Sequence, residues 1–252
     1  MQMLRTEGVT IQFGGLIAVN NVSLHVQKNK ITGLIGPNGA GKTTFFNCIS
    51  GVYVPNKGSV IFDGEHIEGK KPYQINQTGI SRTYQVINLF WNMSVLENVM
   101  VGMHPRLKSG FFSDLIKSPA ERAEEAEAKE KAYEWLKFVG LEKFANDPAG
   151  SLSYGGQRLL EIVRGLASSP KMILLDEPAA GMNTKEKKEF DELLQRILKK
   201  GVTILMIEHD MKLVMNVCDY LYVLEYGKLL AEGEPEAIQN NPEVIRAYLG
   251  GE

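Results

Sequence analysis

The chain has 252 residues, of which 44% are hydrophobic and 23% charged. This composition is typical of folded globular proteins and excludes a disordered or fibrous chain. The net charge of −2 argues against a generally basic surface, so we expect no nucleic-acid partner. The length allows one full α/β domain with a smaller appended part.

In chain order, the first predicted elements are strands. Apolar and polar residues alternate from Met3 to Phe13 and from Val22 to Val26, as they do in half-buried antiparallel strands. The short apolar run Ile31 to Ile35 ends in a glycine-rich turn, and Lys42 to Ser50 then predicts a helix. The N-terminal part therefore predicts a small antiparallel sheet followed by a strand, a loop and a helix.

Later segments predict further strands and helices. Residues 102–118 carry Pro, Gly and Ser, which indicates a loop or broken helices, and Pro119 to Val139 predicts a long exposed helix. The apolar runs Met172 to Leu175 and Thr203 to Ile207 predict central parallel strands, each followed by a helix. Residues 220–231 predict a hairpin, and two short helices are expected near Pro235 and Pro242.

The two cysteines and the longest apolar runs bear on where the protein works. Cys48 and Cys218 are far apart without a C-x-x-C pair, which fits a reducing compartment and excludes a zinc site made of cysteines alone. We interpret both as small core residues. No segment reaches about 18 uninterrupted apolar residues, and Met1 to Arg5 is not a charged region followed by a long apolar run, so we expect no signal sequence there. The sequence predicts a cytosolic chain that does not cross a membrane alone.

The glycine-rich segment after the run Ile31 to Ile35 predicts a phosphate site. Its glycines allow consecutive backbone N–H groups to converge on a phosphate at a helix N-terminus. Lys42 is expected to reach the β- and γ-phosphates, and the Thr43 hydroxyl to bind Mg²⁺. An ordinary glycine turn is the alternative, which the flanking strand and helix disfavour. The segment reads Gly36-Pro37-Asn38-Gly39-Ala40-Gly41-Lys42-Thr43 and matches G-x-x-x-x-G-K-[ST].

Two adjacent carboxylates, Asp176 and Glu177, follow the predicted strand Met172 to Leu175. Ligands in α/β sheets bind at the C-terminal ends of the strands. Asp176 suits the Mg²⁺ shell, and Glu177 suits a general base that polarises an attacking water. A strand ending in a solvated turn would explain such a pair alone, but the phosphate loop favours the catalytic interpretation.

A third motif carries a family resemblance. Residues 152–158, with Arg164, resemble the signature motif of the ABC ATPases. In that family the signature of one subunit completes the phosphate site of the other, so the resemblance implies a head-to-tail dimer with two composite sites. Ser153 and Gly155 at a helix N-terminus would make an anion-binding surface. Tyr154 departs from the usual Gly and Gly156 from the usual Gln. The residues implied to face the partner's ATP are Ser153, Tyr154, Gly155, Gly156 and Gln157.

The remaining motifs of this family occur in order. Gln85 resembles the Q-loop glutamine, residues 179–183 the D-loop, and His209 the switch histidine. The resemblance implies that Gln85 takes part in the Mg²⁺ shell and that Gln85, His209 and Lys42 join Glu177 in catalysis. A lone His209 would otherwise be an ordinary helix-start histidine. Asn183 replaces the usual D-loop Asp and loses its charge.

The adenosine part of ATP would contact residues outside the phosphate loop. Phe13 occupies the position of the adenine-stacking aromatic in the family, and an aromatic ring supplies the necessary π-face. A core phenylalanine is the alternative. With Val19 and Thr44, Phe13 completes the nucleotide-binding set that the resemblance implies.

More specific stretches resemble the LivG-type ATPases of branched-chain amino acid uptake systems. The resemblance implies ATP and Mg²⁺ as cofactors, and a peripheral position on the cytoplasmic face of the inner membrane. It also implies a second ATPase, two membrane permease subunits and, indirectly, a substrate-binding protein as partners. Related ATPases serve urea, short amides or lipopolysaccharide export, and these alternatives stay open. The stretches are residues 13–20, 81–90, 176–183, 207–215 and 245–250.

The implied fold class is α/β. We expect a P-loop NTPase core of the ABC ATPase type with a mostly parallel central sheet, an N-terminal antiparallel β-subdomain and an inserted α-helical subdomain. The chain would form one domain over residues 1–252. Its core would comprise residues 1–84 and 171–252, and its helical part about residues 85–170.

The sequence also predicts a surface for the membrane subunit and disfavours two other ATP-dependent functions. The segment Gln85 to Val99 is expected to receive a helix of the membrane subunit through exposed side chains (Leu89, Phe90, Trp91 and Met93), with core packing as the alternative. A DNA-repair or chromosome-clamp ATPase would carry a long coiled coil between phosphate loop and signature, and no sustained heptads occur there. A small-molecule kinase would lack the motifs at residues 153–157 and His209.

Overall fold

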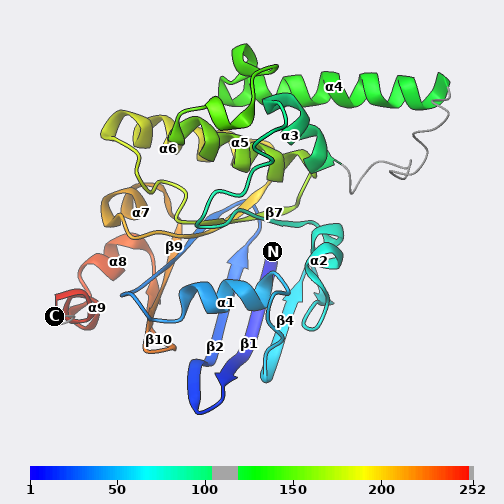
Figure 1. Cartoon of the computed structure of the whole chain (residues 1–252). Coiled ribbons are helices and arrows are strands. Elements are labelled where there is room, and N and C mark those ends of the chain that lie inside the picture. The colour runs from blue at the N-terminus through cyan, green and yellow to red at the C-terminus, as the bar shows by residue number, and fades with distance from the viewer. Residues whose placement is uncertain (104–118, 250–252) are drawn as a thin grey trace. The chain divides into compact units, whose positions relative to one another are not determined.

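The computed structural model describes residues 1–103 and 119–249, and these divide into two compact units (Figure 1). The first unit contains residues up to 85 and those from 171 onward, and the second contains the described residues between 86 and 170. A loop or broken helices were predicted for residues 102–118. Residues 102 and 103 are helical, and the rest of this segment lies outside the described residues. No helix within these described ranges is long and apolar enough to cross a membrane.

The N-terminal sheet of the first unit is antiparallel, as predicted, with strand order β2-β1-β4-β5. Its second strand starts at Leu16 instead of Val22. The apolar–polar pattern did not reveal the N-terminal half of this strand. Register shifts interrupt its pairing with the first strand, and Asn21 takes a positive φ of 56°, so side chains do not alternate regularly between the two faces there. The strands are β1 (Gln2–Phe13), β2 (Leu16–Gln27), β4 (Lys57–Phe62) and β5 (Glu65–His66).

The second sheet of this unit has the order β10-β9-β3-β8-β7-β6 and is parallel except for β10. Strands β3, β7 and β8 are buried along their whole length, which explains their continuous apolar runs. The predicted mostly parallel sheet is confirmed. The strands are β3 (Ile31–Ile35), β6 (Ile80–Arg82), β7 (Met172–Asp176), β8 (Thr203–Ile207), β9 (Tyr220–Glu225) and β10 (Lys228–Gly233).

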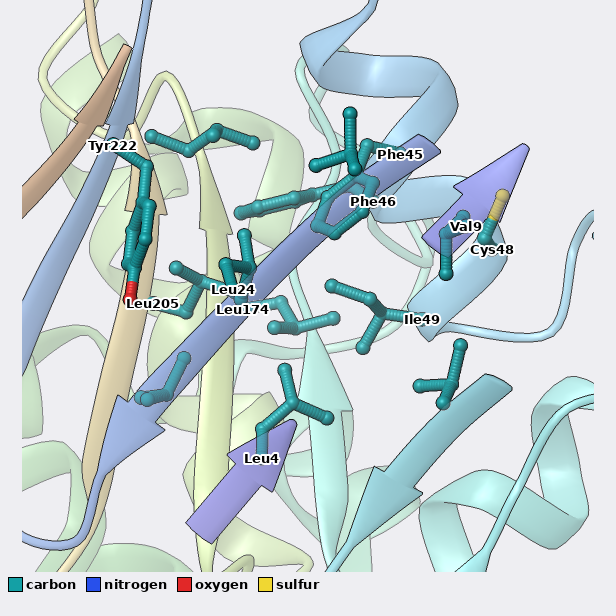
Figure 2. Packing of buried hydrophobic residues seen from close by; sticks show 14 of the residues in the cluster. Leu4, Val9, Leu24, Phe45, Phe46, Cys48, Ile49, Leu174, Leu205 and Tyr222 are labelled. Carbon is teal, nitrogen blue, oxygen red and sulfur yellow. The ribbon is translucent and has the colours of Figure 1, made fainter. Parts of the chain in front are cut away.

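Helix α1 fills the space between the two sheets. Figure 2 shows Phe45 and Phe46 of α1 among buried side chains that include Leu24 of β2, Leu174 of β7 and Tyr222 of β9. The helices of this unit are α1 (Lys42–Ile49), α2 (Pro72–Thr78), α6 (Thr184–Lys199), α7 (Met211–Val217), α8 (Pro235–Gln239) and α9 (Pro242–Leu249).

Both cysteines are buried, which confirms the prediction that they are core residues. Burial raises the pKa of the Cys48 thiol and of the Cys218 thiol to about 12, because a thiolate would lose its hydration there. Neither thiol is therefore a reactive nucleophile in the folded protein.

The second unit is helical, with a core of its own formed by side chains such as Val99, Leu136 and Leu160. The predicted long helix is confirmed with its bounds, and ion pairs such as Glu125–Lys129 (2.8 Å) lie along its surface. The unit contains α3 (Val95–Met103), α4 (Pro119–Val139) and α5 (Tyr154–Ala167), with short 3₁₀ helices at Glu142–Phe144 and Ala149–Ser151.

One exposure prediction in this unit is wrong. Leu89 is only 4% exposed and belongs to the core of the second unit, whereas Phe90 and Trp91 are 48% and 46% exposed. The buried Asn98 amide accepts from Phe90 N–H and donates to Phe90 C=O, both at 3.0 Å. These two bonds hold the backbone beside Leu89 in place, and no local sequence pattern signals them.

Candidate functional site

The phosphate loop joins the end of β3 to the start of α1. Gly36, Gly39 and Gly41 have φ values of 144°, 78° and 96°, which L side chains rarely adopt. A Cβ at Gly36 would lie 2.1 Å from the Leu224 carbonyl oxygen, and one at Gly41 2.5 Å from the Ala18 carbonyl oxygen. No heavy atom would lie within 4 Å of a Cβ at Gly39. The loop is therefore fixed by backbone packing at both ends and open at its middle, as a site for a phosphate group requires.

Lys42 is the first residue of α1 and is 6% exposed. Its ammonium group donates to the carbonyl oxygens of Gly36, at 2.6 Å, and Pro37, at 2.8 Å. Burial lowers the pKa of Lys42, and the carboxylates of Glu177 and Asp176 act in the opposite direction. The loop thus encloses a buried cation at a helix N-terminus, an arrangement that suits a polyanionic ligand.

Asp176 ends β7 and is 1% exposed. Its Oδ2 accepts from Nη2 of Arg82 at 3.0 Å, and Arg82 Nη1 donates to Asn47 Oδ1 and Ser50 Oγ, both at 2.7 Å. Asn47 lies in α1 and Ser50 caps its end. Arg82 therefore ties the carboxylate of Asp176 to the helix that follows the phosphate loop. No sequence pattern indicates this role of Arg82, because its partners lie 32 to 94 residues away in the chain.

Replacing Arg82 with Met is expected to lower the free energy of unfolding by about 3 to 5 kcal/mol, because the buried ion pair between Arg82 and Asp176 is broken. Urea denaturation of the purified chain measures this change. Arg5→Met is the matched control, since Arg5 pairs with Glu7 at 3.0 Å with side chains 44% and 52% exposed. Its cost should stay below about 1 kcal/mol. Equal, small effects of both substitutions would contradict this account of Arg82.

Two of the predicted catalytic residues, Gln85 and His209, contact the carboxylate of a third, Glu177. Its Oε1 lies 2.7 Å from His209 Nε2, and its Oε2 accepts from Gln85 Nε2 at 3.2 Å. These residues follow β6, β7 and β8, whose ends share the carboxyl edge of the parallel sheet. Glu177 adopts a φ of 49°, a strained value of the kind found at functional sites. Its side chain is 19% exposed, so a water molecule can reach a carboxylate that two neighbours orient.

The oxygen atoms available at this edge fit a magnesium ion. Asp176 offers a carboxylate, Gln85 an amide and Thr43, exposed in the first turn of α1, a hydroxyl. Such hard oxygen donors are the ligands that Mg²⁺ prefers. Within residues 1–103 and 119–249 no three His, Cys, Asp or Glu side chains form a metal cage. A Mg²⁺ ion would therefore take its other ligands from phosphate oxygens and water.

Two hydrophobic residues outside the phosphate loop, Phe13 and Val19, were predicted to bind nucleotide, and they lie in different environments. Phe13, at the end of β1, is 46% exposed, which excludes the core alternative, and its ring meets the edge of Tyr53 at a centroid distance of 5.2 Å. Tyr53 was not predicted, because nothing in the sequence pairs it with Phe13. Val19 is fully buried and packs beneath Gly41. Val19 thus supports the phosphate loop from within the fold.

The signature segment begins helix α5 of the second unit. Ser153 is the N-cap, and its Oγ accepts from Gly156 N–H at 3.3 Å. Gln157 Nε2 donates to Leu152 C=O at 2.9 Å, and the hydroxyl of Tyr154, which is 49% exposed, accepts from the buried Arg158 at 3.2 Å. Ser153 and Tyr154 therefore lie on the surface at the positive end of a 14-residue helix.

Asn183, the departure noted in the D-loop, is the N-cap of α6. Its side-chain oxygen accepts from Lys185 N–H and Glu186 N–H, and Glu186 accepts from Asn183 N–H at 2.8 Å. This reciprocal arrangement is a capping box. The amide oxygen of Asn183 therefore stabilises the start of α6 without the charge of an aspartate.

Comparisons with known proteins agree with this geometry. The family model described as "ABC transporter" matches residues 19–180, and the model "Branched-chain amino acid ATP-binding cassette transporter" matches residues 228–252. The chain is 50% identical to the high-affinity branched-chain amino acid transport ATP-binding protein LivG of Escherichia coli (strain K12) over 98% of both chains. It is 47% identical to the corresponding protein BraF of Pseudomonas aeruginosa, again over 98% of both.

Solved structures show the same fold. MJ1267, an ATP-binding cassette of an ABC transporter solved in its ADP conformation, has a TM-score of 0.87 and 36% identity, with 99% of both chains covered. A dimeric post-hydrolysis cassette, MJ0796, bound to ADP and phosphate, has a TM-score of 0.78 and 25% identity, with 92% of this chain and 99% of that chain covered. The predicted α/β P-loop fold class is confirmed.

Proposed function

The chain belongs to the ABC transporter family of ATP-binding proteins, and from this premise we propose that it is the ATP-hydrolysing subunit that powers import of branched-chain amino acids. The observation that carries hydrolysis is the Glu177 carboxylate, held between Gln85 and His209 at the end of β7. A protein that binds a nucleotide without hydrolysing it needs only the phosphate loop. A carboxylate oriented by two neighbours beside that loop is what activation of water requires.

In the proposed mechanism, the loop from Gly36 to Thr43 holds the phosphates of ATP, and Lys42 turns its ammonium group from the loop carbonyls to the β- and γ-phosphates. Thr43, Asp176 and Gln85 would hold Mg²⁺, which would supply positive charge to neutralise the phosphates. The adenine ring stacks on the exposed face of Phe13. Thr44 completes the nucleotide site, and the buried Val19 supports that site from beneath Gly41.

The chemical step is the transfer of the γ-phosphoryl group to water. Glu177 accepts a proton from the attacking water, which forms a bond to phosphorus while the bond to the ADP oxygen breaks. His209 and Gln85 keep the carboxylate in place through their contacts of 2.7 and 3.2 Å. The products are ADP and phosphate, and no acceptor molecule is phosphorylated.

The working assembly is proposed to contain a second ATPase subunit. The surface at Ser153, Tyr154 and Gly155, with Gly156 and Gln157 behind it, would approach the ATP of the partner, and the dimeric MJ0796 cassette supports such a pairing. ATP would close the dimer and hydrolysis would reopen it. The whole chain, 1–252, acts in this proposal as one ATPase domain.

Transport requires two membrane permease subunits and, outside the membrane, a substrate-binding protein. The ATPase would sit peripherally on the cytoplasmic face of the inner membrane. The exposed rings of Phe90 and Trp91 are the side chains proposed to contact a permease helix, because exposed aromatic groups are typical of such contacts. DNA is not among the proposed partners.

The choice of branched-chain amino acids rests on the relatives and on the match at residues 228–252. ATPases of urea, amide or lipopolysaccharide systems are the alternatives. The test uses membrane vesicles that contain the chain with its own permease subunits and binding protein. We expect ATP-dependent uptake of labelled leucine, isoleucine and valine, and loss of that uptake in the Glu177→Gln variant. Uptake of urea or a short amide without leucine would contradict the proposal.

A further inference from the structure

Glu208 is a buried carboxylate that the mechanism above does not use. It follows β8, lies one residue before His209 and is only 4% exposed. Its Oε1 accepts from Ala179 N–H at 2.8 Å, and its Oε2 accepts from the N–H groups of His209, at 3.0 Å, and Asp210, at 3.3 Å. Burying a carboxylate is costly, and hydrogen bonds from backbone N–H groups offset that cost.

These bonds replace the sheet where it ends. Strands β7 and β8 pair as far as Asp176 and Ile207, and Glu177 N–H still donates to Ile207 C=O at 3.0 Å. Beyond this point the segments after β7 and β8 form separate loops. The Glu208 carboxylate links these loops by hydrogen bonds, since it accepts from Ala179 N–H in the loop after β7 and from His209 N–H in the loop after β8.

We propose that Glu208 is a positioning residue that holds His209 against Glu177 by tying these two loops together. Ala179 lies two residues after Glu177, and His209 lies one residue after Glu208, so one carboxylate fixes both backbones that bear the 2.7 Å contact. The inference rests on the proposed ATPase function. This role requires a side chain in which both terminal atoms accept hydrogen bonds. The amide of a glutamine would instead turn its NH₂ group toward a backbone N–H.

The test is the Glu208→Gln substitution. Steady-state ATP hydrolysis is measured for the variant and for the unsubstituted protein, each in the same assembly with its partner subunits. The kcat should fall at least tenfold. The KM for ATP should stay within twofold, because Lys42 bonds to Gly36 and Pro37, whereas Glu208 bonds to the loops after β7 and β8. Glu68→Gln is the matched control, since Glu68 also accepts a backbone N–H, from Val60 at 3.0 Å, but on the antiparallel sheet. Its kcat should stay within twofold of the original.

A second background separates positioning from simple destabilisation. In a His209→Ala protein, Glu208→Gln should cause no further fall in kcat, since its effect acts through His209. An equal fall in both backgrounds, or unchanged kcat in the original background, would overturn the inference. If Glu208→Gln does not fold, Glu208→Asp, which keeps the charge on a shorter side chain, is compared in the same two backgrounds. Absence of hydrolysis in the unsubstituted protein and in the Glu68→Gln control would instead refute the proposed function.

Discussion

Glu177→Gln is expected to lower the rate of ATP hydrolysis by about 10³-fold while leaving the affinity for ATP within threefold of the original. The amide keeps the shape of the side chain but cannot accept the proton of the attacking water, and a general base contributes about 10² to 10⁴-fold to such reactions. Binding should persist because Lys42 makes its hydrogen bonds to Gly36 and Pro37 and none to Glu177. Phosphate release and equilibrium binding of a fluorescent ATP analogue measure the two quantities.

The control for this substitution is Glu65→Gln on β5, where the glutamate side chain is 73% exposed and pairs with Lys70 at 3.7 Å. Its hydrolysis rate should match that of the unsubstituted protein. A Glu177→Gln protein that still hydrolyses ATP within tenfold of the original rate would show that another group activates the water.

Lys42→Met is expected to weaken ATP binding by at least about 100-fold. The substitution removes the buried ammonium group at the N-terminus of α1 and replaces it with a side chain that cannot donate a hydrogen bond. Charge-assisted hydrogen bonds contribute about 1.5 to 3 kcal/mol each, and about 2.7 kcal/mol corresponds to 100-fold in affinity. Equilibrium dialysis with labelled ATP measures the dissociation constant.

The matched control is Lys131→Met on α4, where the lysine is 64% exposed and pairs with Glu127. That protein should bind ATP as tightly as the original. Equal affinities for Lys42→Met and the original would mean that the loop from Gly36 to Thr43 does not hold the phosphates. Together, the substitutions at Lys42 and Glu177 separate binding of ATP from its hydrolysis.

The sequence predicted the parts of the site that follow from local chemistry. Glycines before Lys42 predicted the phosphate loop because few residues tolerate the φ values found at Gly36 and Gly41. Runs of buried apolar residues predicted β3, β7 and β8 because parallel strands are covered on both faces. The rule that ligands bind at the carboxyl edge of such a sheet then predicted the roles of Asp176 and Glu177. The role of His209 came from the family resemblance.

The missed features depend on contacts between distant segments. β6 has only the three residues Ile-Ser-Arg, so it has no apolar run, and the role of Arg82 depends on Asp176 and α1. Glu208 was part of a recognised motif, but its bond to Ala179 N–H appears only when the ends of β7 and β8 are side by side. The wrong exposure of Leu89 has the same origin, because Leu89 joins a buried core with Leu136 and Leu160, which lie far away in the chain.

The chemical state of the nucleotide that the Glu177→Gln protein retains tests directly whether Glu177 activates the water. After incubation with labelled ATP and Mg²⁺ and rapid removal of free nucleotide, the retained label is separated by chromatography. We expect intact ATP on the Glu177→Gln protein, and ADP with released phosphate from the original protein over the same time. Equal amounts of ADP from the two proteins would contradict the claim that Glu177 activates the water.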